Sequence, residues 1–390
     1  MKKQAGGNDP APQVEIPRGG AIRRVAVNML MLTLPSLLVL GLVLELFFRT
    51  LIPGSSLPYT YFDPVEKILR FDPTGPRNGI CTRGKLAQQR GRWRINDEGW
   101  NSTLEYLPAG TRRKSLVSII GDSYVEALSV DVDNNLSAVL GELLGSEWEV
   151  YSFGISGAPL SQYLNVSRYV ARRFAPDIMV FLVLHNDFDE SVAELERTLH
   201  FLQLSIANNT VQEVMPIAYP PSVIRRIAVH SALIRYLWFN LRAQQIFDAQ
   251  YWQQREQNFN ANIDVDAVSR RHDVIQRATD YVVGHIVKEN PGVPVVFMMD
   301  APRRDIYEDR LHESDVLWLH DMIGQSCATY GALFIDLSEP FQDAYRTERK
   351  KFNTEYDFHW NNSGHELAAD TLYERMTASG LLQVEWSEGE

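Results

Sequence analysis

Cysteine is scarce in this chain, and its scarcity limits the chemistry that can be expected. There are only two cysteines, Cys81 and Cys327, and neither belongs to a CxxC pair or a cluster with histidine. This spacing argues against a thiolate zinc site. In an oxidising compartment the two thiols could form a disulfide, and otherwise they would be separate buried side chains.

Positive charge is also in short supply. The net charge is −11, yet the first 50 residues carry six basic and three acidic side chains, which leaves −14 for the rest. A nucleic-acid-binding protein needs a basic surface that faces the phosphates, so the acidic body excludes that class. Hydrophobic residues make up 45% and charged residues 22%, as in a protein with a packed core.

Only one long apolar run is present, at residues 25–44, and it contains no charged residue. At 1.5 Å per residue its length matches a hydrocarbon core of roughly 30 Å. Pro35 would kink such a helix without forbidding it. A buried core helix or a cleaved signal peptide are the alternatives. However, the run is long for a signal peptide and no A-x-A site follows it, so we predict an uncleaved anchor.

The charges that flank this run predict its orientation. Arg18, Arg23 and Arg24 precede it, whereas Arg49 stands nearly alone after it. By the positive-inside rule, residues 1–24 form a cytoplasmic tail, residues 25–48 span the membrane, and the body lies outside. The prediction is a single-pass protein of the inner membrane with a periplasmic or extracellular body.

The body shows alternating strand and helix patterns. Residues 49–113 are turn-rich and predict a juxtamembrane, partly β segment, and residues 114–385 predict an α/β domain. Buried strands are predicted at 115–121, 148–154, 177–184, 293–300 and 332–338, with helices at 134–145, 159–174, 268–289, 315–331 and 363–380. The last helix has Ser363 as its predicted N-cap. Fully apolar strands between helices indicate a parallel sheet covered on both faces.

Residues 190–262 interrupt this alternation and are predicted to be an insertion. They include a predicted helix at 222–247 that is rich in aromatic side chains. Four arginines within it favour a soluble or surface-lying helix over a second membrane span; they are Arg225, Arg226, Arg235 and Arg242.

Small or polar residues follow three consecutive predicted strands. Ser123, Gly157 and Asn186 each come just after a strand. Carboxyl ends of parallel strands meet at one edge of a sheet, where ligands bind. We therefore expect these three residues to converge there. For Ser123 alone, a helix N-cap would be an equally good interpretation.

Four sequence blocks carry a family resemblance. In chain order they are GDSYVEAL, FGISGAPLSQYL, VLHND and DFHWNNSGHELA. Together they resemble the SGNH/GDSL hydrolase superfamily, over roughly residues 114–380. The resemblance implies a flavodoxin-like three-layer α/β sandwich with a central parallel sheet and a serine nucleophile. The anchor and the last block are similar to membrane-anchored bacterial envelope members.

The site residues make chemical sense as a catalytic triad. A serine hydroxyl is a poor nucleophile unless a base lies within hydrogen-bond reach, and an imidazole can serve near neutral pH. We predict Ser123 as nucleophile, His359 as base and Asp357 as the group that orients it. The superfamily usually writes this block DxxH, but Tyr356 occupies that place here, so Asp357 fits the pattern less closely than the other two.

The resemblance also implies an oxyanion hole. Its donors would be the backbone N–H groups of Ser123 and Gly157 and the side-chain amide of Asn186. His185 stands where the family usually has glycine. It could contact substrate, or its ring could be satisfied by nearby backbone groups.

Other polar residues receive plainer interpretations. Asp187 and Asp189 are predicted to form a solvated acidic turn rather than a metal pair. Trp93 and Trp100, with their neighbouring arginines, either line a carbohydrate cleft or belong to a half-buried strand. No cofactor or metal is expected.

The predicted function is that of a membrane-anchored extracytoplasmic serine esterase. Its expected substrate is an O-acetyl or other acyl ester of an envelope or exported glycan, or another small ester. The same acyl-enzyme could serve an O-acetyltransferase, and a catalytically silent glycan-binding or scaffolding member is the alternative of a different class. Envelope polysaccharide assembly proteins are the expected partners besides the membrane.

Overall fold

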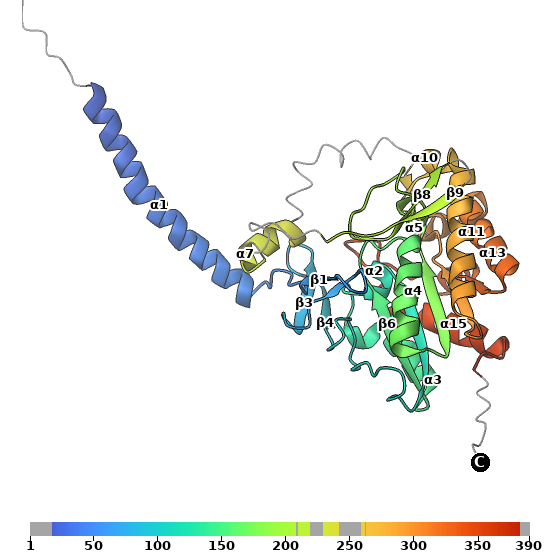
Figure 1. The fold of residues 1–390 in the computed structure, drawn as a ribbon. Helices are drawn as coiled ribbons and strands as arrows, with labels where there is room; N and C mark the ends of the chain where they lie inside the picture. The colour runs from blue at the N-terminus through green and yellow to red at the C-terminus, as the bar shows by residue number, and fades with distance from the viewer. Residues whose placement is uncertain (1–17, 208–209, 219–228, 242–258, 262, 383–390) are drawn as a thin grey trace, which may run out of the picture.

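The computed structural model describes residues 18–207, 210–218, 229–241, 259–261 and 263–382, and Figure 1 shows their arrangement. A long helix, α1 (Arg18–Thr50), stands away from the body of the protein (Figure 1). Its stretch Val27–Thr50 is long and apolar enough to cross a membrane, judged by length and composition. The helix extends past both ends of the predicted 25–48, and Pro35 lies inside it.

A five-stranded parallel sheet forms the centre of the body. In spatial order its strands are β13 (Leu333–Asp336), β12 (Val295–Met299), β7 (Ile178–Val183), β5 (Ser115–Gly121) and β6 (Trp148–Gly154). Numbered by their place in the chain, they run 5-4-3-1-2, which is the flavodoxin-like order. The order reverses between β5 and β7, so the switch point lies where the sequence predicted the site.

Helices cover both faces of this sheet because successive strand residues point to opposite sides. In β7, Met179 and Phe181 face one core, whereas Val180 and Leu182 face the other. The first core is covered by α4 (Leu160–Phe174), α11 (His272–Glu289) and α13 (Leu317–Tyr330). The second is covered by α3 (Leu136–Leu144), α12 (Arg303–Tyr307), α14 (Ser338–Glu348) and α15 (Asn362–Ala378). The predicted three-layer α/β fold is confirmed.

Two antiparallel hairpins occupy the segment between α1 and the sheet. They are β1 (Thr60–Asp63) with β2 (Ile68–Phe71), and β3 (Asn78–Arg83) with β4 (Gln89–Arg94). Trp93 and Trp100 are 2% and 1% exposed and belong to the first core, so they do not line a cleft. Cys81 and Cys327 are both buried and free, so they form no disulfide.

The remaining described elements are short. They are α2 (Ser123–Glu126), η1 (Val132–Asn134), α5 (Asp187–Glu190), η4 (Leu311–Glu313), α10 (Val265–Ser269), and the hairpins β8 (Gln203–Ala207) with β9 (Thr210–Val214) and β10 (Phe259–Asn260) with β11 (Ile263–Asp264). Within the predicted helix 222–247, the structure describes α7 (Ala232–Arg235) and the following π-helix η2 (Tyr236–Asn240). Residues 222–228 and 242–247 of that prediction lie outside the described residues.

One local prediction was wrong. The N-cap of α15 is Asn361, whose side chain accepts a hydrogen bond from the N–H of Gly364, and not Ser363. Ser363 already lies inside the helix. Both residue types are good caps, so the sequence offered two neighbouring candidates.

The close approach of β6 to α2 yields a testable prediction. A Cβ at Gly154 would overlap the backbone of Val125 and Glu126, whereas a Cβ at Gly141 in α3 would meet only Val150, at 3.8 Å. We expect Gly154→Ala to lower the free energy of unfolding by about 2–3 kcal/mol through overpacking. Gly141→Ala should leave it unchanged or raise it by up to about 1 kcal/mol. Chemical denaturation of the full chain in detergent tests this, and equal stability of the two variants would contradict it.

Candidate active site

The proposed nucleophile lies in the sharp turn between β5 and α2. Asp122 caps α2, and its Oδ1 accepts a hydrogen bond of 2.9 Å from the N–H of Tyr124. This carboxylate fixes the turn so that Ser123 begins the helix at the carboxyl end of the strand. The hydroxyl of Ser123 lies 3.1 Å from the other Asp122 oxygen, Oδ2.

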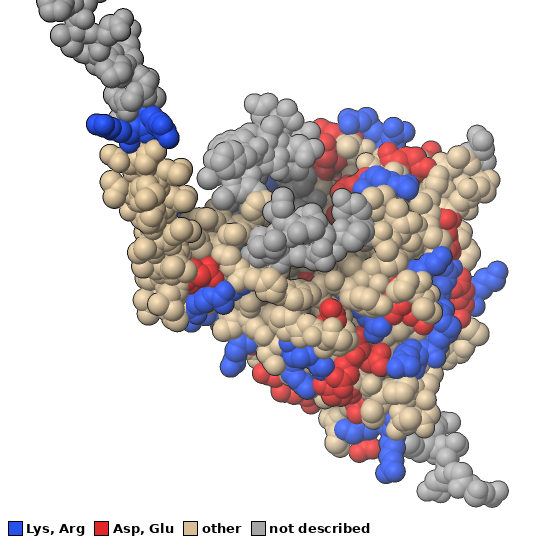
Figure 2. All heavy atoms as spheres, turned by 60° about the vertical axis from the view of Figure 1, so that its left-hand side comes forward, with Lys and Arg blue, Asp and Glu red and all other residues tan. Residues whose placement is uncertain are grey.

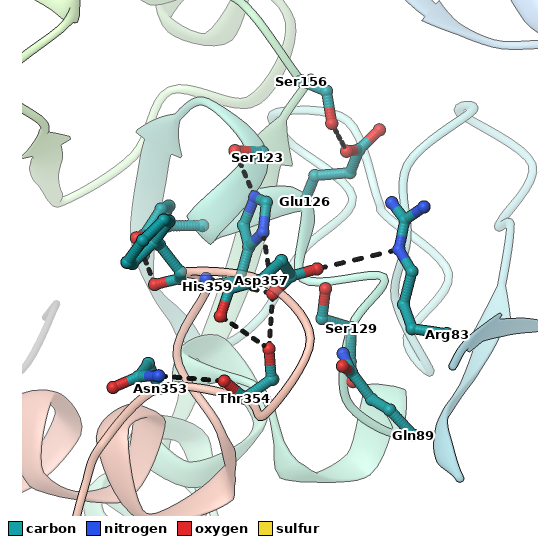
Figure 3. A network of polar contacts seen from close by, with 12 residues as sticks. Arg83, Gln89, Ser123, Glu126, Ser129, Ser156, Asn353, Thr354, Asp357 and His359 are labelled. Carbon is teal, nitrogen blue, oxygen red and sulfur yellow. Dashed lines mark hydrogen bonds and ion pairs between the residues drawn. The ribbon is translucent and has the colours of Figure 1, made fainter. Parts of the chain in front are cut away.

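The predicted base reaches this serine. Nε2 of His359 lies 2.8 Å from Oγ of Ser123, although the two residues are 236 positions apart in the chain (Figure 3). His359 belongs to the loop that precedes α15, and its side chain is 30% exposed. The distance is that of a hydrogen bond through which the hydroxyl proton can pass to the imidazole.

Asp357 lies on the other side of the imidazole. Its Oδ1 is 3.3 Å from Nδ1 of His359 and accepts a hydrogen bond of 3.1 Å from the backbone N–H of His359. The contact with Nδ1 is electrostatic, because Nδ1 makes no aligned hydrogen bond to a described residue in this conformation. The same Oδ1 also accepts from the hydroxyl of Thr354 (Figure 3). The two-residue spacing therefore brings carboxylate and ring together.

Asp357 is held in its ionised form. Burial raises the pKa of its carboxyl, but the hydrogen bonds and charges of His359, Thr354 and Arg83 outweigh burial and lower the pKa. Arg83, at the end of β3, places Nε 3.7 Å from Oδ2 of Asp357 (Figure 3). Arg83 could not be predicted from the sequence, because nothing near it marks a contact with a residue so distant in the chain.

The three predicted oxyanion donors surround the same edge of the sheet. Gly157 follows β6 with a φ of +76°, a conformation that favours glycine, and a Cβ there would meet only Phe201 at 3.8 Å. Asn186 follows β7 and is 7% exposed, and its Nδ2 donates a hydrogen bond of 3.0 Å to Oε1 of Glu190. An amide carries two hydrogens, so one can bind Glu190 while the other serves a ligand.

His185 is engaged inside the protein. It is 2% exposed, and its Nε2 lies 2.9 Å from Nε2 of His320. Nδ1 of His320 lies in turn 3.0 Å from Asp336. Burial lowers the pKa of His185 well below its ordinary value, and the charge of His320 adds to this effect. In this conformation the ring contacts another histidine, and a contact between His185 and substrate stays a prediction.

The prediction of a solvated acidic turn was wrong. Asp187 is 0% exposed, and its Oδ2 accepts hydrogen bonds of 2.8 Å from the hydroxyl of Tyr163 and from the N–H of Leu184. Burial raises the pKa of Asp187 well above its ordinary value, and the charge of Asp122 adds to this. Asp187 thus joins the loop after β7 to α4. Among the described residues, no group of three or more acidic, histidine or cysteine side chains could hold a metal ion.

A buried network that the sequence did not reveal joins the serine turn to the histidine loop. The hydroxyl of Tyr124 donates a hydrogen bond of 2.7 Å to the carbonyl of Phe358, and Nη2 of Arg303 donates to the same carbonyl at 2.6 Å. Arg303 lies 3.3 Å from Asp300, which accepts a hydrogen bond of 2.9 Å from the indole of Trp360. These contacts flank His359 on both sides and hold its loop against α2.

A further buried carboxyl lies beside the site. Glu126 is 6% exposed and accepts a hydrogen bond from the hydroxyl of Ser156, the residue before Gly157 (Figure 3). Burial raises its pKa from 4.5 to about 7, although the hydrogen bonds from Ser156 and the charge of His359 oppose this. The folded protein therefore holds a proton on this carboxyl more tightly than the unfolded chain does.

This raised pKa predicts a pH-dependent stability. The protonated carboxyl of Glu126 adds to the free energy of unfolding. This contribution is fully present below pH 4.5 and is lost as the pH rises through about 7. We expect Glu126→Gln to remove about 3 kcal/mol of the loss in unfolding free energy between pH 4 and pH 8. Glu142→Gln, on the exposed face of α3, is the control and should leave the pH profile unchanged. Parallel profiles for parent and Glu126→Gln would contradict the assignment.

Several solved structures are similar to this chain. Among solved structures, the chain resembles an alpha/beta hydrolase enzyme from the metagenome of Lake Arreo, Spain, with 13% identity, coverage of 72% of this chain and 99% of that chain, and a TM-score of 0.38. It also resembles the lipase/acylhydrolase from Enterococcus faecalis, with 12% identity, 68% and 96% coverage, and a TM-score of 0.36. A third is a carbohydrate acetylesterase family member from Sinorhizobium meliloti, with 10% identity, 69% and 100% coverage, and a TM-score of 0.33.

Sequence comparison identifies the family. No curated protein matches the chain. The model of the GDSL-like Lipase/Acylhydrolase family matches residues 119–367, a stretch that begins inside β5 and ends inside α15. It therefore includes the serine turn, the switch point of the sheet and the histidine loop. The chain belongs to the GDSL-like Lipase/Acylhydrolase family and is an ester hydrolase.

Proposed function

We propose that this protein is a membrane-anchored, extracytoplasmic serine esterase that works through an acyl-enzyme on Ser123. The observation that carries the proposal is the 2.8 Å contact between Nε2 of His359 and Oγ of Ser123. A serine in this position without a base would be a weak nucleophile, and an imidazole at hydrogen-bond distance removes that obstacle.

The proposed reaction has two halves. Oγ of Ser123 attacks the ester carbonyl carbon while His359 takes the hydroxyl proton, and a tetrahedral intermediate forms. When it collapses, the bond to the alcohol oxygen breaks, His359 returns the proton to that oxygen, and the acyl group stays on Ser123. Water then attacks the acyl-enzyme, His359 takes a proton from the water, and the carboxylic acid leaves as Ser123 regains its proton.

The negative charge that develops on the carbonyl oxygen needs donors that are already in place. The N–H groups of Ser123 and Gly157 and the amide of Asn186 are the proposed set. Glu190 supports this role for Asn186, because its acceptance of one amide hydrogen fixes the plane of the side chain. Removing one such donor typically slows catalysis by about 100-fold to 1,000-fold.

Asp357 is the proposed partner of the imidazolium that forms during attack. The carboxylate is ionised, because the contacts that lower its pKa outweigh burial, and it lies 3.3 Å from Nδ1. A negative charge at this distance favours the protonated ring in the transition state. Arg83 shares this carboxylate through Oδ2 and leaves Oδ1 for His359.

The membrane helix supports the proposed location. The basic residues Arg18, Arg23 and Arg24 lie at the end of α1 away from the body, and the body follows its other end (Figure 1). By the positive-inside rule, this arrangement supports a location of the catalytic domain outside the cytoplasm, where envelope and exported glycans occur. An anchored esterase would meet such polymers at the membrane surface.

The proposed substrate is an O-acetyl or other acyl ester of such a glycan. Phe358, the residue between Asp357 and His359, has a side chain that is 74% exposed. An exposed ring in the catalytic loop is available to contact a bound sugar, while its backbone carbonyl is held by Tyr124 and Arg303. If a sugar hydroxyl replaces water in the second half-reaction, the same residues perform O-acetyl transfer.

Substitution of the nucleophile tests the acyl-enzyme. We expect Ser123→Ala and His359→Ala each to lower kcat for a small acetyl ester by at least about 1,000-fold. Ser123→Ala should also abolish labelling by a fluorophosphonate probe. Ser129→Ala, six residues along the chain, is the control and should keep both activity and labelling. A folded parent protein that takes no label on Ser123 would instead support the silent, glycan-binding alternative.

Substitution of Asn186 tests the oxyanion hole separately from the nucleophile. We expect Asn186→Ala to lower kcat by about 100-fold to 1,000-fold with little change in KM, because the amide acts mainly in the transition state. Near-UV circular dichroism controls for folding. A variant with unchanged kcat would remove Asn186 from the proposed set.

Transfer and hydrolysis are separated by following the acetyl group. With an acetylated donor alone, an esterase releases free acetate at its full rate. With an added unacetylated oligosaccharide, a transferase moves the acetyl group to the sugar, and mass spectrometry detects the product. Acetyl appearing on the oligosaccharide without free acetate would replace the esterase proposal by the transferase.

A further inference from the structure

Among the residues that the structure describes, an exposed apolar face lies beside the base of α1. It is formed by four side chains of α7, η2 and the next residue, which we call the α7 face. Its members are Ile234, Leu237, Trp238 and Leu241, with exposed fractions of 43%, 41%, 51% and 39%. We propose that the α7 face lies in the headgroup region of the same membrane leaflet in which the span of α1 ends. This inference rests on α1 crossing a membrane, as in the proposed function.

The two sides of this short helical segment differ sharply. The exposed apolar residues recur at intervals of three, one and three positions, which places them on one side. The opposite side carries Ala232, Tyr236 and Asn240, which are all buried. Helices that lie in a membrane interface bury their apolar face at the boundary between headgroups and acyl chains, and the described part of this segment leaves such a face exposed.

The packed side is attached to α1. The ring of Tyr236 stacks on that of Phe48 with centroids 3.8 Å apart. Glu45 accepts hydrogen bonds from the N–H groups of Ala232 and Leu233, both at 2.9 Å, and from the hydroxyl of Ser231 at 2.8 Å. These contacts satisfy the first N–H groups of α7, which would otherwise lack partners.

The chain after α1 and the strand β3 hold the segment from the other direction. A Cβ at Gly54 would lie 2.5 Å from the carbonyl of Ala232, so the two backbones are in close contact. The amide of Asn240 donates to Oγ1 of Thr82 at 3.1 Å, and the hydroxyl of Tyr236 donates to the carbonyl of Lys85 at 2.9 Å. The α7 face is therefore fixed in position relative to both α1 and the catalytic domain.

The position of these contacts along α1 indicates that lipid covers the α7 face. Glu45 and Phe48 lie in the last two turns of the apolar stretch Val27–Thr50, so α7 lies at the level where the span ends. Figure 1 shows α7 at the base of α1, between that helix and the body. The face of α1 that Figure 2 shows carries no charged side chain between the arginines near its start and the charged residues near its end. A bilayer around α1 would reach the α7 face, and tryptophan is common at that depth.

The position of the face has a consequence for the active site. Nη1 of Arg83 donates to the carbonyl of Phe239 in η2 at 3.4 Å, while Nε of the same arginine lies 3.7 Å from Asp357. A segment anchored in the leaflet would thus set the height of the catalytic loop above the membrane. An enzyme held in this way acts on esters close to the bilayer surface.

Site-directed fluorescence in nanodiscs that each contain one full-length chain tests the proposal. An environment-sensitive fluorophore is attached to a single introduced cysteine at Trp238, with Cys81 and Cys327 replaced by alanine. Val65, in the turn between β1 and β2 and 83% exposed, is the matched control on the body, and Leu38, 62% exposed on α1, reports the span itself. Nitroxides are placed on the lipid headgroups or the acyl chains.

We expect the label at 238 to be blue-shifted and quenched most strongly by headgroup nitroxides, the label at 38 by acyl-chain nitroxides, and the label at 65 by neither. A label at 238 that behaves like that at 65, while that at 38 is quenched, would overturn this inference and leave the anchor intact. An unquenched label at 38 would overturn the anchor. If the label at 238 becomes shielded only in discs that contain two chains, a second copy covers the face and the lipid proposal is wrong.

Discussion

The hydrogen bond between Ser123 and His359 depends on the parallel sheet. β5 carries the serine to the carboxyl edge of the sheet, and the chain must complete the other four strands of the sheet before the histidine loop returns to that edge. The three central strands β5, β7 and β12 are buried on both faces, so the two cores that the sheet separates fix where the loops begin. A shift of one strand would move hydroxyl and imidazole out of hydrogen-bond distance.

Burial around this contact is balanced by charge. Asp357 is ionised because three partners outweigh its loss of solvent, whereas Glu126 and Asp187, without cationic partners of that strength, have raised pKa values. The site thus combines an ionised carboxylate, Asp357, beside His359 with two buried carboxyls, Glu126 and Asp187, whose pKa values are raised. A buried charge needs a partner of opposite sign, and the buried guanidinium of Arg303 has one in Asp300. The same guanidinium donates to the carbonyl of Phe358 and so holds the histidine loop.

The α/β domain and α1 are connected by a continuous series of contacts. Glu45 of α1 caps α7, η2 binds β3 through Asn240, and Arg83 at the end of β3 lies against Asp357. Each of these three contacts joins a single pair of polar groups, so the connection does not require a large interface between α1 and the body. In the proposed arrangement the membrane fixes the orientation of the active site as well as its location.

The strands, the helices of the sandwich, the apolar run of α1 and the family could all be predicted from the amino-acid sequence, because apolar periodicity and motifs such as GDS are properties of neighbouring residues. Its triad was predicted from the same motifs. Only the tertiary structure decided that Trp93 and Trp100 lie in the core, that Asp187 is buried, and that Asn361 caps α15. The partners Arg83, Arg303 and Tyr124 also came from the fold, since contacts between residues that are distant in the chain leave no local pattern. Burial and pKa depend on what the rest of the chain packs against a side chain, and that is set by three-dimensional packing.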